Sequence, residues 1–158
     1  MHNPNDSIKI LFTDMDGTLL LNDSTVSDEM KAALDRLIRN GHKLVLTSGR
    51  PLDSILEVMQ ASDLFYPGTL VISNNGSLIY DCTAGAPLME KTVPFPIASG
   101  IIREAEVLGI HIQTYTDHEI VCKKEDEEVI YYRKRIHLPL ITAPDILSVL
   151  ERPPYKLH

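Results

Sequence analysis

Three short apolar runs that alternate with two amphipathic segments constrain the fold of this chain most strongly. The runs cover residues 8–12, 42–46 and 70–73, and each has the length of a strand. An order of strand, helix, strand, helix, strand predicts a parallel sheet with right-handed crossovers. We therefore predict an α/β fold whose core is a three-layer, Rossmann-like parallel sheet.

Both intervening segments carry the signals that begin and end helices. Ser27 is suited to cap a helix whose first turn holds Asp28 and Glu29, since carboxylates favour the positive end of the helix dipole. Asn40–Gly41 supplies a left-handed stop, and Pro51 is suited to the first position of a second helix. The apolar stripe of the first helix has helical spacing and comprises Met30, Ala33, Leu34, Leu37 and Ile38.

Two carboxylates stand two residues apart just after the first apolar run. Side chains alternate faces in an extended chain, so Asp14 and Asp16 are expected to point the same way beyond the strand. One carboxylate can attack phosphorus while the other moves protons to and from the reacting oxygens. Gly17 permits the tight turn that follows, and Thr18 can bond its own backbone. The two carboxylates are thus a candidate nucleophile and acid/base pair.

Two further polar segments follow the second and third apolar runs. The second run ends in Thr-Ser-Gly-Arg-Pro, and the third is followed by Asn-Asn-Gly. Ligands gather beyond the carboxyl ends of parallel strands, so Asp14, Ser48 and Asn75 are expected to line one crevice. The residues leave two interpretations of Arg50 open, since it can pair with a substrate or brace its own loop.

These segments resemble the haloacid dehalogenase (HAD) superfamily of phosphohydrolases. Residues 14–20, Asp-Met-Asp-Gly-Thr-Leu-Leu, look like the first motif of that family, and residues 47–51 resemble the second. Residues 74–80 are similar to the Asn-Gly hairpin of the Cof-type sugar-phosphate phosphatase branch. The resemblance implies that the predicted sheet is the N-terminal half of a HAD fold.

The resemblance also implies roles for individual residues. Asp14 matches the nucleophile that forms an aspartyl-phosphate, and Asp16 matches the acid/base. Ser48 matches the hydroxyl that binds the phosphoryl oxygens, with Thr47 as the alternative. A magnesium ion (Mg²⁺) would be held by the Asp14 carboxylate and the Asp16 carbonyl. The other substrate-binding residues implied are Gly17, Thr18, Gly49, Arg50 and Asn75.

Two later motifs of the family have no match after residue 84. The family places a lysine and then a Gly-Asp-x-x-Asn/Asp run far downstream, whereas residues 123–128 read as a charged helix start without glycine. Mg²⁺ prefers about six oxygen ligands in octahedral geometry, so the missing acids weaken the expected metal site. We therefore expect the chain to correspond to the N-terminal part of such an enzyme.

A second region is expected to follow the core. A Cys-Thr-Ala-Gly-Ala-Pro segment reads as a linker and divides the chain into a core at 1–84 and a second domain at 85–158. Pro96 is suited to open a helix whose predicted shared face comprises Ile97, Ile101, Ala105 and Leu108. A hairpin at 111–122 and a helix at 126–135 follow. This order resembles a partial α+β cap domain of the Cof type, which selects the leaving group of the substrate.

Composition restricts the classes of partner and the compartment. The chain has 158 residues, 44% apolar residues and a net charge of −7. The negative charge argues against nucleic acid and leaves a small phosphorylated metabolite as the expected partner. No apolar run is long enough to span a membrane, and Met1–Asp6 lacks the features of a signal peptide. Cys82 and Cys122 form no disulfide framework, so we expect a cytoplasmic protein with two free thiols.

Two hypotheses of different classes follow from the sequence. The first is a Mg²⁺-dependent phosphomonoester hydrolase that acts on sugar phosphates or similar small esters through an aspartyl-phosphate. The second is a catalytically inactive fragment or association module that needs a partner or the absent motifs, and whose open sheet edges favour self-association. A phospho-acceptor receiver domain also uses an aspartate at a strand end, but it lacks the Asp-x-Asp-Gly-Thr segment.

Overall fold

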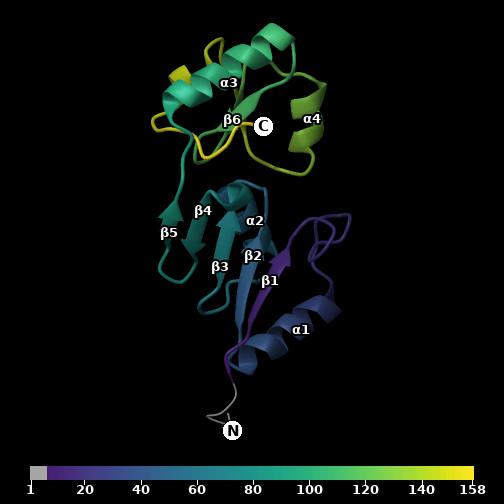
Figure 1. Ribbon diagram of the computed structural model, residues 1–158. Coiled ribbons are helices and arrows are strands. Elements are labelled where there is room, and N and C mark those ends of the chain that lie inside the picture. The colour runs from purple at the N-terminus through teal and green to yellow at the C-terminus, as the bar shows by residue number, and fades with distance from the viewer. Residues whose placement is uncertain (1–6) are drawn as a thin grey trace.

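A computed structural model of the protein describes residues 7–158, which form two separate sheets (Figure 1). The larger sheet has the strand order β1–β2–β3–β4–β5, and the smaller has the order β6–β7–β8. We name residues 7–90 the five-stranded unit and residues 95–158 the three-stranded unit. The expectation that Met1–Asp6 is no signal peptide lies outside the described residues.

The five-stranded sheet confirms the predicted α/β fold class. Strands β1, β2 and β3 are parallel, and β4 and β5 continue the sheet in antiparallel register. The ladder between the first two strands runs from the Ile10–Lys43 pair to the Asp14–Thr47 pair. The first strand therefore starts later than its apolar run and ends on Asp14 itself. The elements are β1 (Ile10–Asp14), α1 (Asp28–Arg39), β2 (Lys43–Thr47), α2 (Leu52–Ala61), β3 (Leu70–Ser73), β4 (Leu78–Asp81) and β5 (Ala86–Glu90).

The helices of this unit begin and end where the local chemistry predicts, with one difference. The Ser27 hydroxyl accepts a hydrogen bond from the Met30 N–H, and Gly41 adopts a φ of 79° directly after the last turn of α1. Pro51 precedes α2 as its N-cap instead of occupying the first helical position, since its ψ of 152° is extended. The first helical residue of α2 is therefore Leu52.

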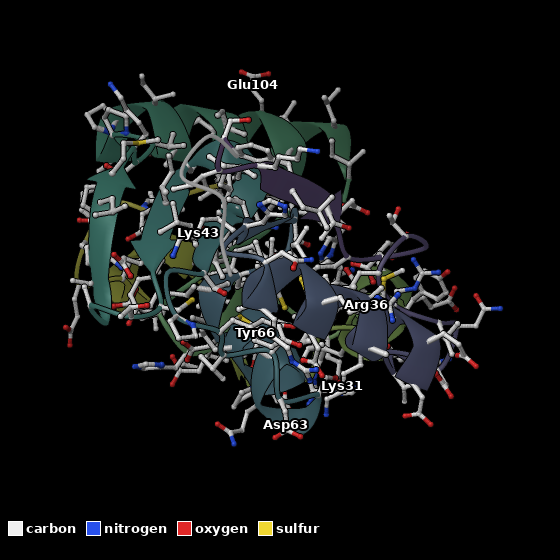
Figure 2. All side chains as sticks on the ribbon, turned by 90° about the horizontal axis from the view of Figure 1, so that it is seen from below. Lys31, Arg36, Lys43, Asp63, Tyr66 and Glu104 are labelled. Carbon is white, nitrogen blue, oxygen red and sulfur yellow. The ribbon has the colours of Figure 1, made fainter. Side chains whose placement is uncertain are left out.

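One apolar cluster holds both helices against the same face of the sheet. Leu44 and Leu46 share a face of β2 because side chains alternate along a strand, and side chains of α1 and α2 both join their cluster. On the outer side, the Lys31 ammonium pairs with Asp63 at 2.8 Å, and the Tyr66 hydroxyl donates to Asp35 (Figure 2). The buried cluster comprises Met15, Leu19, Leu20, Leu34, Leu44, Leu46, Ile55, Met59, Leu64 and Val71.

The three-stranded unit contains the predicted hairpin and two helices. Strands β6 and β7 are antiparallel, and β8 lies parallel to β7. His158 and Gln113 exchange both of their backbone hydrogen bonds, so the end of the described chain lies along the free edge of β6. No helix within residues 7–158 has both the length and the apolar content of a membrane span. The elements are α3 (Phe95–Leu108), β6 (Gln113–Tyr115), β7 (Ile120–Cys122), α4 (Glu127–Arg133) and β8 (Leu140–Thr142), with 3₁₀ turns at Asn74–Gly76 and Ile146–Val149.

The buried face of α3 differs from the predicted one. The helix buries Ala98, Ile102 and Ala105 and leaves Ile97, Ile101 and Leu108 exposed. Of the predicted face, Ala105 alone is buried. Apolar residues occupy two adjacent rows of this helix, so periodicity alone does not decide which row faces the sheet. The stop at Gly109 is confirmed, with a φ of 67°.

The predicted division after residue 84 stays a prediction. In the structure β5 pairs with β4 in the five-stranded sheet, and the chain leaves that sheet after Glu90. The outgoing segment is held by the returning one, since the Val93 N–H donates to the Pro154 carbonyl at 2.7 Å. The two units are thus connected at a pair of neighbouring chain segments.

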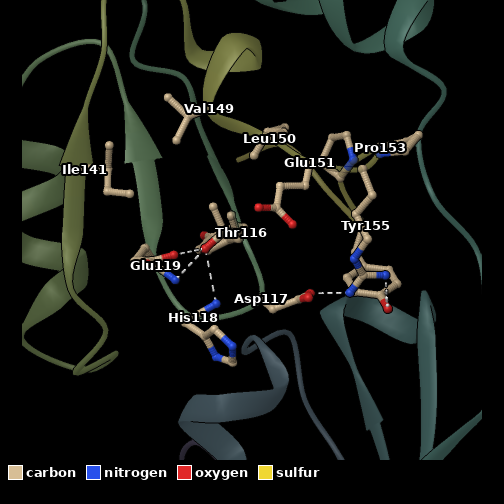
Figure 3. A pocket seen from close by; sticks show the side chains of 13 residues that line it. Thr116, Asp117, His118, Glu119, Ile141, Val149, Leu150, Glu151, Pro153 and Tyr155 are labelled. Carbon is tan, nitrogen blue, oxygen red and sulfur yellow. Dashed lines mark hydrogen bonds and ion pairs between the residues drawn. The ribbon is translucent and has the colours of Figure 1, made fainter.

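The turn between β6 and β7 brings charged contacts from the three-stranded unit to the five-stranded unit. His118 Nδ1 lies 2.5 Å from the Asp53 carboxylate at the beginning of α2. Arg152 pairs with Glu90 at 3.1 Å and with Asp117. Figure 3 shows Asp117 and His118 on this turn, at the edge of a cavity of about 400 Å³. The contacts of His118 with Asp53 and of Arg152 with Glu90 therefore link the two units outside the apolar clusters.

The contact between His118 and Asp53 makes the stability of the chain depend on pH. The hydrogen bond and charge of Asp53 raise the pKa of His118 above its ordinary value of 6.5. The stabilisation is therefore complete below pH 6.5 and is lost as the pH rises through the higher folded-state value. The His118 side chain is 74% exposed and that of Asp53 36%, so solvent screens the pair and we expect it to contribute about 0.2–1 kcal/mol to the free energy of unfolding. Urea unfolding at pH values on both sides of this range measures the contribution of the pair. The proteins to compare are wild type, His118→Gln, Asp53→Asn and the double variant. A double variant whose stability keeps the full pH dependence of wild type would contradict the assignment.

We propose that the open edge of β1 supports self-association. Among the strands of residues 7–158, only β2 pairs with β1, and Ile10 and Phe12 are 55% and 59% exposed on one face of this strand. Unpaired apolar edge strands recruit further strands, and a lysine blocks such pairing. We expect Phe12→Lys to lower the concentration-dependent association that sedimentation velocity detects in wild type. Phe65→Lys is the matched control, because Phe65 is exposed away from any strand; a wild-type chain that stays monomeric at all concentrations would contradict the proposal.

Candidate active site

The end of β1 presents two carboxylates on either side of a buried anchor. Met15 is fully buried in the apolar cluster, so its neighbours Asp14 and Asp16 are turned outward. The turn is closed by the Leu19 and Leu20 N–H groups, which donate to the Asp14 and Met15 carbonyls. No side-chain hydrogen bond within residues 7–158 ends on the Asp14 carboxylate, which is exposed. Asp14 is therefore accessible to a reactant.

The second carboxylate is held by a buried guanidinium. Arg50 donates from Nε to one Asp16 oxygen at 2.9 Å and from Nη2 to the other at 2.6 Å. Arg50 is only 3% exposed, whereas the Asp16 side chain is 46% exposed. The hydrogen bonds from Arg50 hold the pKa of Asp16 below its ordinary value, against the opposing effect of burial. Asp16 is thus an oriented, ionised carboxylate at the crevice surface.

The loop after β2 places a hydroxyl group beside the end of β1. The Thr47 hydroxyl donates to the Thr13 carbonyl at 3.1 Å and so joins the two strand ends. The Ser48 hydroxyl accepts the Arg50 N–H at 3.1 Å, and Ser48 is 8% exposed. Since a hydroxyl can donate and accept at once, the Ser48 hydrogen stays free to donate to a ligand. The Thr47 hydroxyl hydrogen, by contrast, is already donated to the Thr13 carbonyl.

The turn after β3 is fastened to the loop after β2. The Asn74 N–H donates to the Arg50 carbonyl at 3.0 Å, and the Asn75 N–H donates to the Ser48 carbonyl at 3.4 Å. Both asparagines have left-handed φ values, 51° and 58°, which asparagine tolerates better than most residues. A Cβ at Gly49 would lie 2.6 Å from the Asn75 side-chain oxygen, so a larger residue there would have to displace the Asn75 amide. The three loops form one connected platform.

Residues of both units line a crevice of about 460 Å³ above this platform. The five-stranded unit contributes Asp16, Gly49, Arg50 and Asn75. The three-stranded unit contributes Glu128, Tyr131, Tyr132, Arg135, Ile136, Lys156 and His158. The crevice therefore combines two carboxylates with several cations and aromatic rings, a lining suited to an anionic ligand with a polar organic group.

The structure places the eight residues predicted for the site on the three loops of the platform, and four of them line the crevice. Asp14, Gly17 and Thr18 lie exposed on the loop after β1 and are not among the lining residues. Ser48 lies buried next to Gly49 and is also outside the lining. Of the two interpretations of Arg50, the contacts fit a brace for the loops, because its guanidinium is taken up by Asp16 and Ser54.

The crevice residues of the three-stranded unit were not assigned by sequence reasoning. The sequence does contain a pattern that places four of them together. They follow the i, i+3, i+4, i+7 spacing of one helix face and are Glu128, Tyr131, Tyr132 and Arg135. Lys156 and His158 have no such local signal, since their position depends on pairing with β6.

The donor atoms at the end of β1 fit Mg²⁺ in part. The Asp14 carboxylate is exposed and accepts no side-chain hydrogen bond within residues 7–158, as a metal ligand requires. The Asp16 carboxylate is bonded to Arg50, which leaves its carbonyl as the second expected ligand. The described residues contain no group of three His, Cys, Asp or Glu side chains suited to a metal. Mg²⁺ keeps several waters and commonly binds through one or two carboxylates plus a phosphate, so such an ion would bind together with its phosphate ligand.

Comparison with known proteins shows the family to which the chain is similar. A family model of haloacid dehalogenase-like hydrolases matches residues 11–157. A proposed phosphatase of Streptococcus pyogenes serotype M6 is 27% identical over 114 residues, which cover 72% of this chain and 42% of that protein. A 5-amino-6-(5-phospho-D-ribitylamino)uracil phosphatase of Bacillus subtilis is 24% identical over 126 residues, covering 78% of this chain and 42% of the relative. The chain thus spans less than half the length of these curated relatives.

A solved structure shows the same fold. A haloacid dehalogenase-like hydrolase from Bacteroides thetaiotaomicron superposes with a TM-score of 0.81 at 24% sequence identity. The match covers 94% of this chain and 56% of the solved chain. Both sheets of the present structure therefore have counterparts in a known arrangement.

Removal of the guanidinium should change the titration of Asp16. We expect Arg50→Gln to raise the pKa of Asp16 toward its ordinary value of 3.8, because two charge-assisted hydrogen bonds are lost. In wild type the pair stabilises the fold above that value, and the stabilisation is lost as the pH falls through the lower folded-state pKa. Carbon-13 NMR of the side-chain carboxyl measures the shift, with Lys31→Gln as a distant control. An unchanged Asp16 titration in folded Arg50→Gln would contradict the role given to the pair.

Proposed function

This chain belongs to the haloacid dehalogenase-like hydrolases, and we propose that it hydrolyses small phosphate monoesters with Asp14 as the nucleophile. The observation that carries the proposal is the exposed Asp14 carboxylate at the end of β1, beside an oriented Asp16. Attack by a carboxylate oxygen on phosphorus needs such an accessible, ionised group. The loops after β2 and β3 supply hydroxyl and amide groups next to it.

Two displacements at phosphorus complete the proposed reaction. The cycle starts from Asp14 ionised and Asp16 protonated: an Asp14 oxygen forms a bond to phosphorus as the ester P–O bond breaks, and the departing oxygen takes the proton of Asp16. Water then transfers a proton to Asp16 and attacks the phosphorus of the aspartyl-phosphate. The bond between Asp14 and phosphorus breaks, inorganic phosphate leaves, and both carboxylates return to their starting states.

The hydrogen bonds from Arg50 suit Asp16 to accepting a proton from water more than to donating a proton to the leaving oxygen. A lowered pKa keeps Asp16 ionised, which is the form that accepts a proton from water. Donation to the leaving oxygen requires a proton on Asp16, which competes with the two hydrogen bonds from Arg50. Esters with good leaving groups need less proton donation, so we expect them to react fastest.

The remaining platform residues are proposed to bind the phosphoryl group. The Ser48 hydroxyl oxygen accepts the Arg50 N–H, and within residues 7–158 no side-chain hydrogen bond uses its hydrogen, which can therefore be donated to a phosphoryl oxygen. Gly49 and Asn75 line the crevice beside it, and Gly17 and Thr18 offer backbone N–H groups on the loop after β1. When bound at Asp14 and the Asp16 carbonyl, Mg²⁺ would neutralise charge on the phosphoryl oxygens.

The proposed substrates are sugar phosphates or similar small esters. A crevice of about 460 Å³ with tyrosine and arginine side chains supports a leaving group that is polar and of modest size. The Bacillus subtilis relative is named for a phosphorylated ribityl compound, which is of this class. The free thiols of Cys82 and Cys122 support the proposed cytoplasmic location, where disulfides are rare.

Hydrolysis of an aryl phosphate in the presence of Mg²⁺ tests the proposal. We expect Asp14→Asn to lower kcat/KM by about 10³-fold or more, because the amide cannot form the acyl phosphate. Asp28→Asn is the matched control, since this residue lies exposed in the first turn of α1 and should leave turnover unchanged. Phosphate release measured for each variant gives the ratio.

Two results would contradict the proposal for this chain. Equal turnover in wild type and Asp14→Asn would remove the nucleophile assignment. A folded wild-type chain without any turnover would favour the second hypothesis, in which these residues act by association with a partner.

A further inference from the structure

Lys156 is a buried cation that reaches from one unit to the other. Its Nζ donates to the Gly49 carbonyl at 2.5 Å, across 107 residues of sequence. Lys156 is only 9% exposed and lines the crevice. The contact therefore places an ammonium group beside the loop that holds Ser48.

Hydrogen bonds fix the backbone around Lys156 and so orient its side chain toward the platform. The Thr114 hydroxyl donates to the Lys156 carbonyl at 2.8 Å, and His158 exchanges two backbone hydrogen bonds with Gln113. The Tyr115 ring lies under the ammonium group, with 4.7 Å from Nζ to the ring centroid. These contacts hold the stem of Lys156 against β6 while its tip points at the platform.

Within residues 7–158, no carboxylate forms an ion pair with this buried ammonium group. The ammonium group contacts the Gly49 carbonyl and the Tyr115 ring, neither of which carries a compensating charge. Arg135, on the same crevice wall, donates to the Tyr131 hydroxyl and lies over the Tyr131 ring, and it forms no ion pair within residues 7–158. Asp16 is already neutralised by Arg50. Buried charges are normally paired, so the crevice has the electrostatic character of a site for an anion.

We propose that Lys156 binds the phosphoryl group of the ligand and so carries a cation from the three-stranded unit into the phosphate site. An ammonium group has three hydrogens, and Gly49 uses one of them, so further donors are available to phosphoryl oxygens. The inference rests on the proposed phosphate site at Asp14, Ser48 and Asn75. It adds a residue that no motif of the sequence indicated.

Calorimetric titration of the 158-residue chain with inorganic phosphate tests this inference. We expect Lys156→Met to weaken phosphate binding by about tenfold or more, equivalent to about 1.4 kcal/mol. Lys156→Arg keeps the charge and should stay within about threefold of wild type. Lys123→Met is the matched control, because Lys123 is exposed and paired with Glu106 far from the crevice. Far-ultraviolet circular dichroism checks that each variant is folded.

The pH dependence of binding separates a charge role from a packing role. Burial lowers the pKa of Lys156 to about 8, whereas arginine stays charged. The ratio of the wild-type Kd to the Lys156→Arg Kd should therefore rise as the pH increases through about 8. Other titratable and charged groups also face the ammonium group of Lys156. They are the same in wild type and Lys156→Arg, so their effects on the two Kd values cancel in the ratio. These groups are Asp16 and Arg50 from the platform, Glu128, Tyr132 and Arg135 from the α4 side, and Tyr115 and His158.

The outcomes distinguish this inference from the proposed function. Unchanged phosphate affinity in Lys156→Met, together with weaker binding in Ser48→Ala, would overturn the role of Lys156 and leave the phosphate site standing. Absence of phosphate binding by the wild-type chain would overturn both. A flat Kd ratio across the pH range would show that Lys156 packs without contributing charge, which also overturns the inference.

Discussion

The bidentate hydrogen bond between Arg50 and Asp16 is the interaction on which the rest of the site depends. Its guanidinium joins the loop after β2 to the loop after β1, while its backbone N–H and carbonyl bind Ser48 and Asn74. One buried residue thus connects three loops that lie up to 60 positions apart in sequence, and each loop contributes a polar group to the platform. The burial of Arg50 is tolerable because the carboxylate and the Ser54 hydroxyl take up its donors.

The platform supplies carboxylates and neutral donors, and the three-stranded unit supplies the unpaired cations. Asp16 comes from the loop after β1, whereas Arg135 and Lys156 come from the three-stranded unit. A phosphate ligand carries negative charge that both walls can use, through hydrogen bonds on one side and cations on the other. The proposed phosphate ligand would therefore be held by groups of both units.

The sequence predicted the features that depend on neighbouring residues. Asp14 and Asp16 could be placed at a strand end, and the stops of α1 and α3 were correctly located, because turn and capping chemistry is local. The predicted buried face of α3 was wrong, because the helix has two adjacent apolar rows and only packing against the sheet decides that the row with Ala98 and Ile102 is buried. Lys156 could not be predicted, because its contact with Gly49 depends on how two units meet.

Trapping of the covalent intermediate tests the central claim most directly. Rapid acid quenching of the chain with a labelled aryl phosphate and Mg²⁺, followed by peptide mapping, locates the phosphate that the protein carries. The account predicts a hydroxylamine-labile acyl phosphate on the peptide that contains Asp14. An acid-stable phosphate on another residue would contradict it.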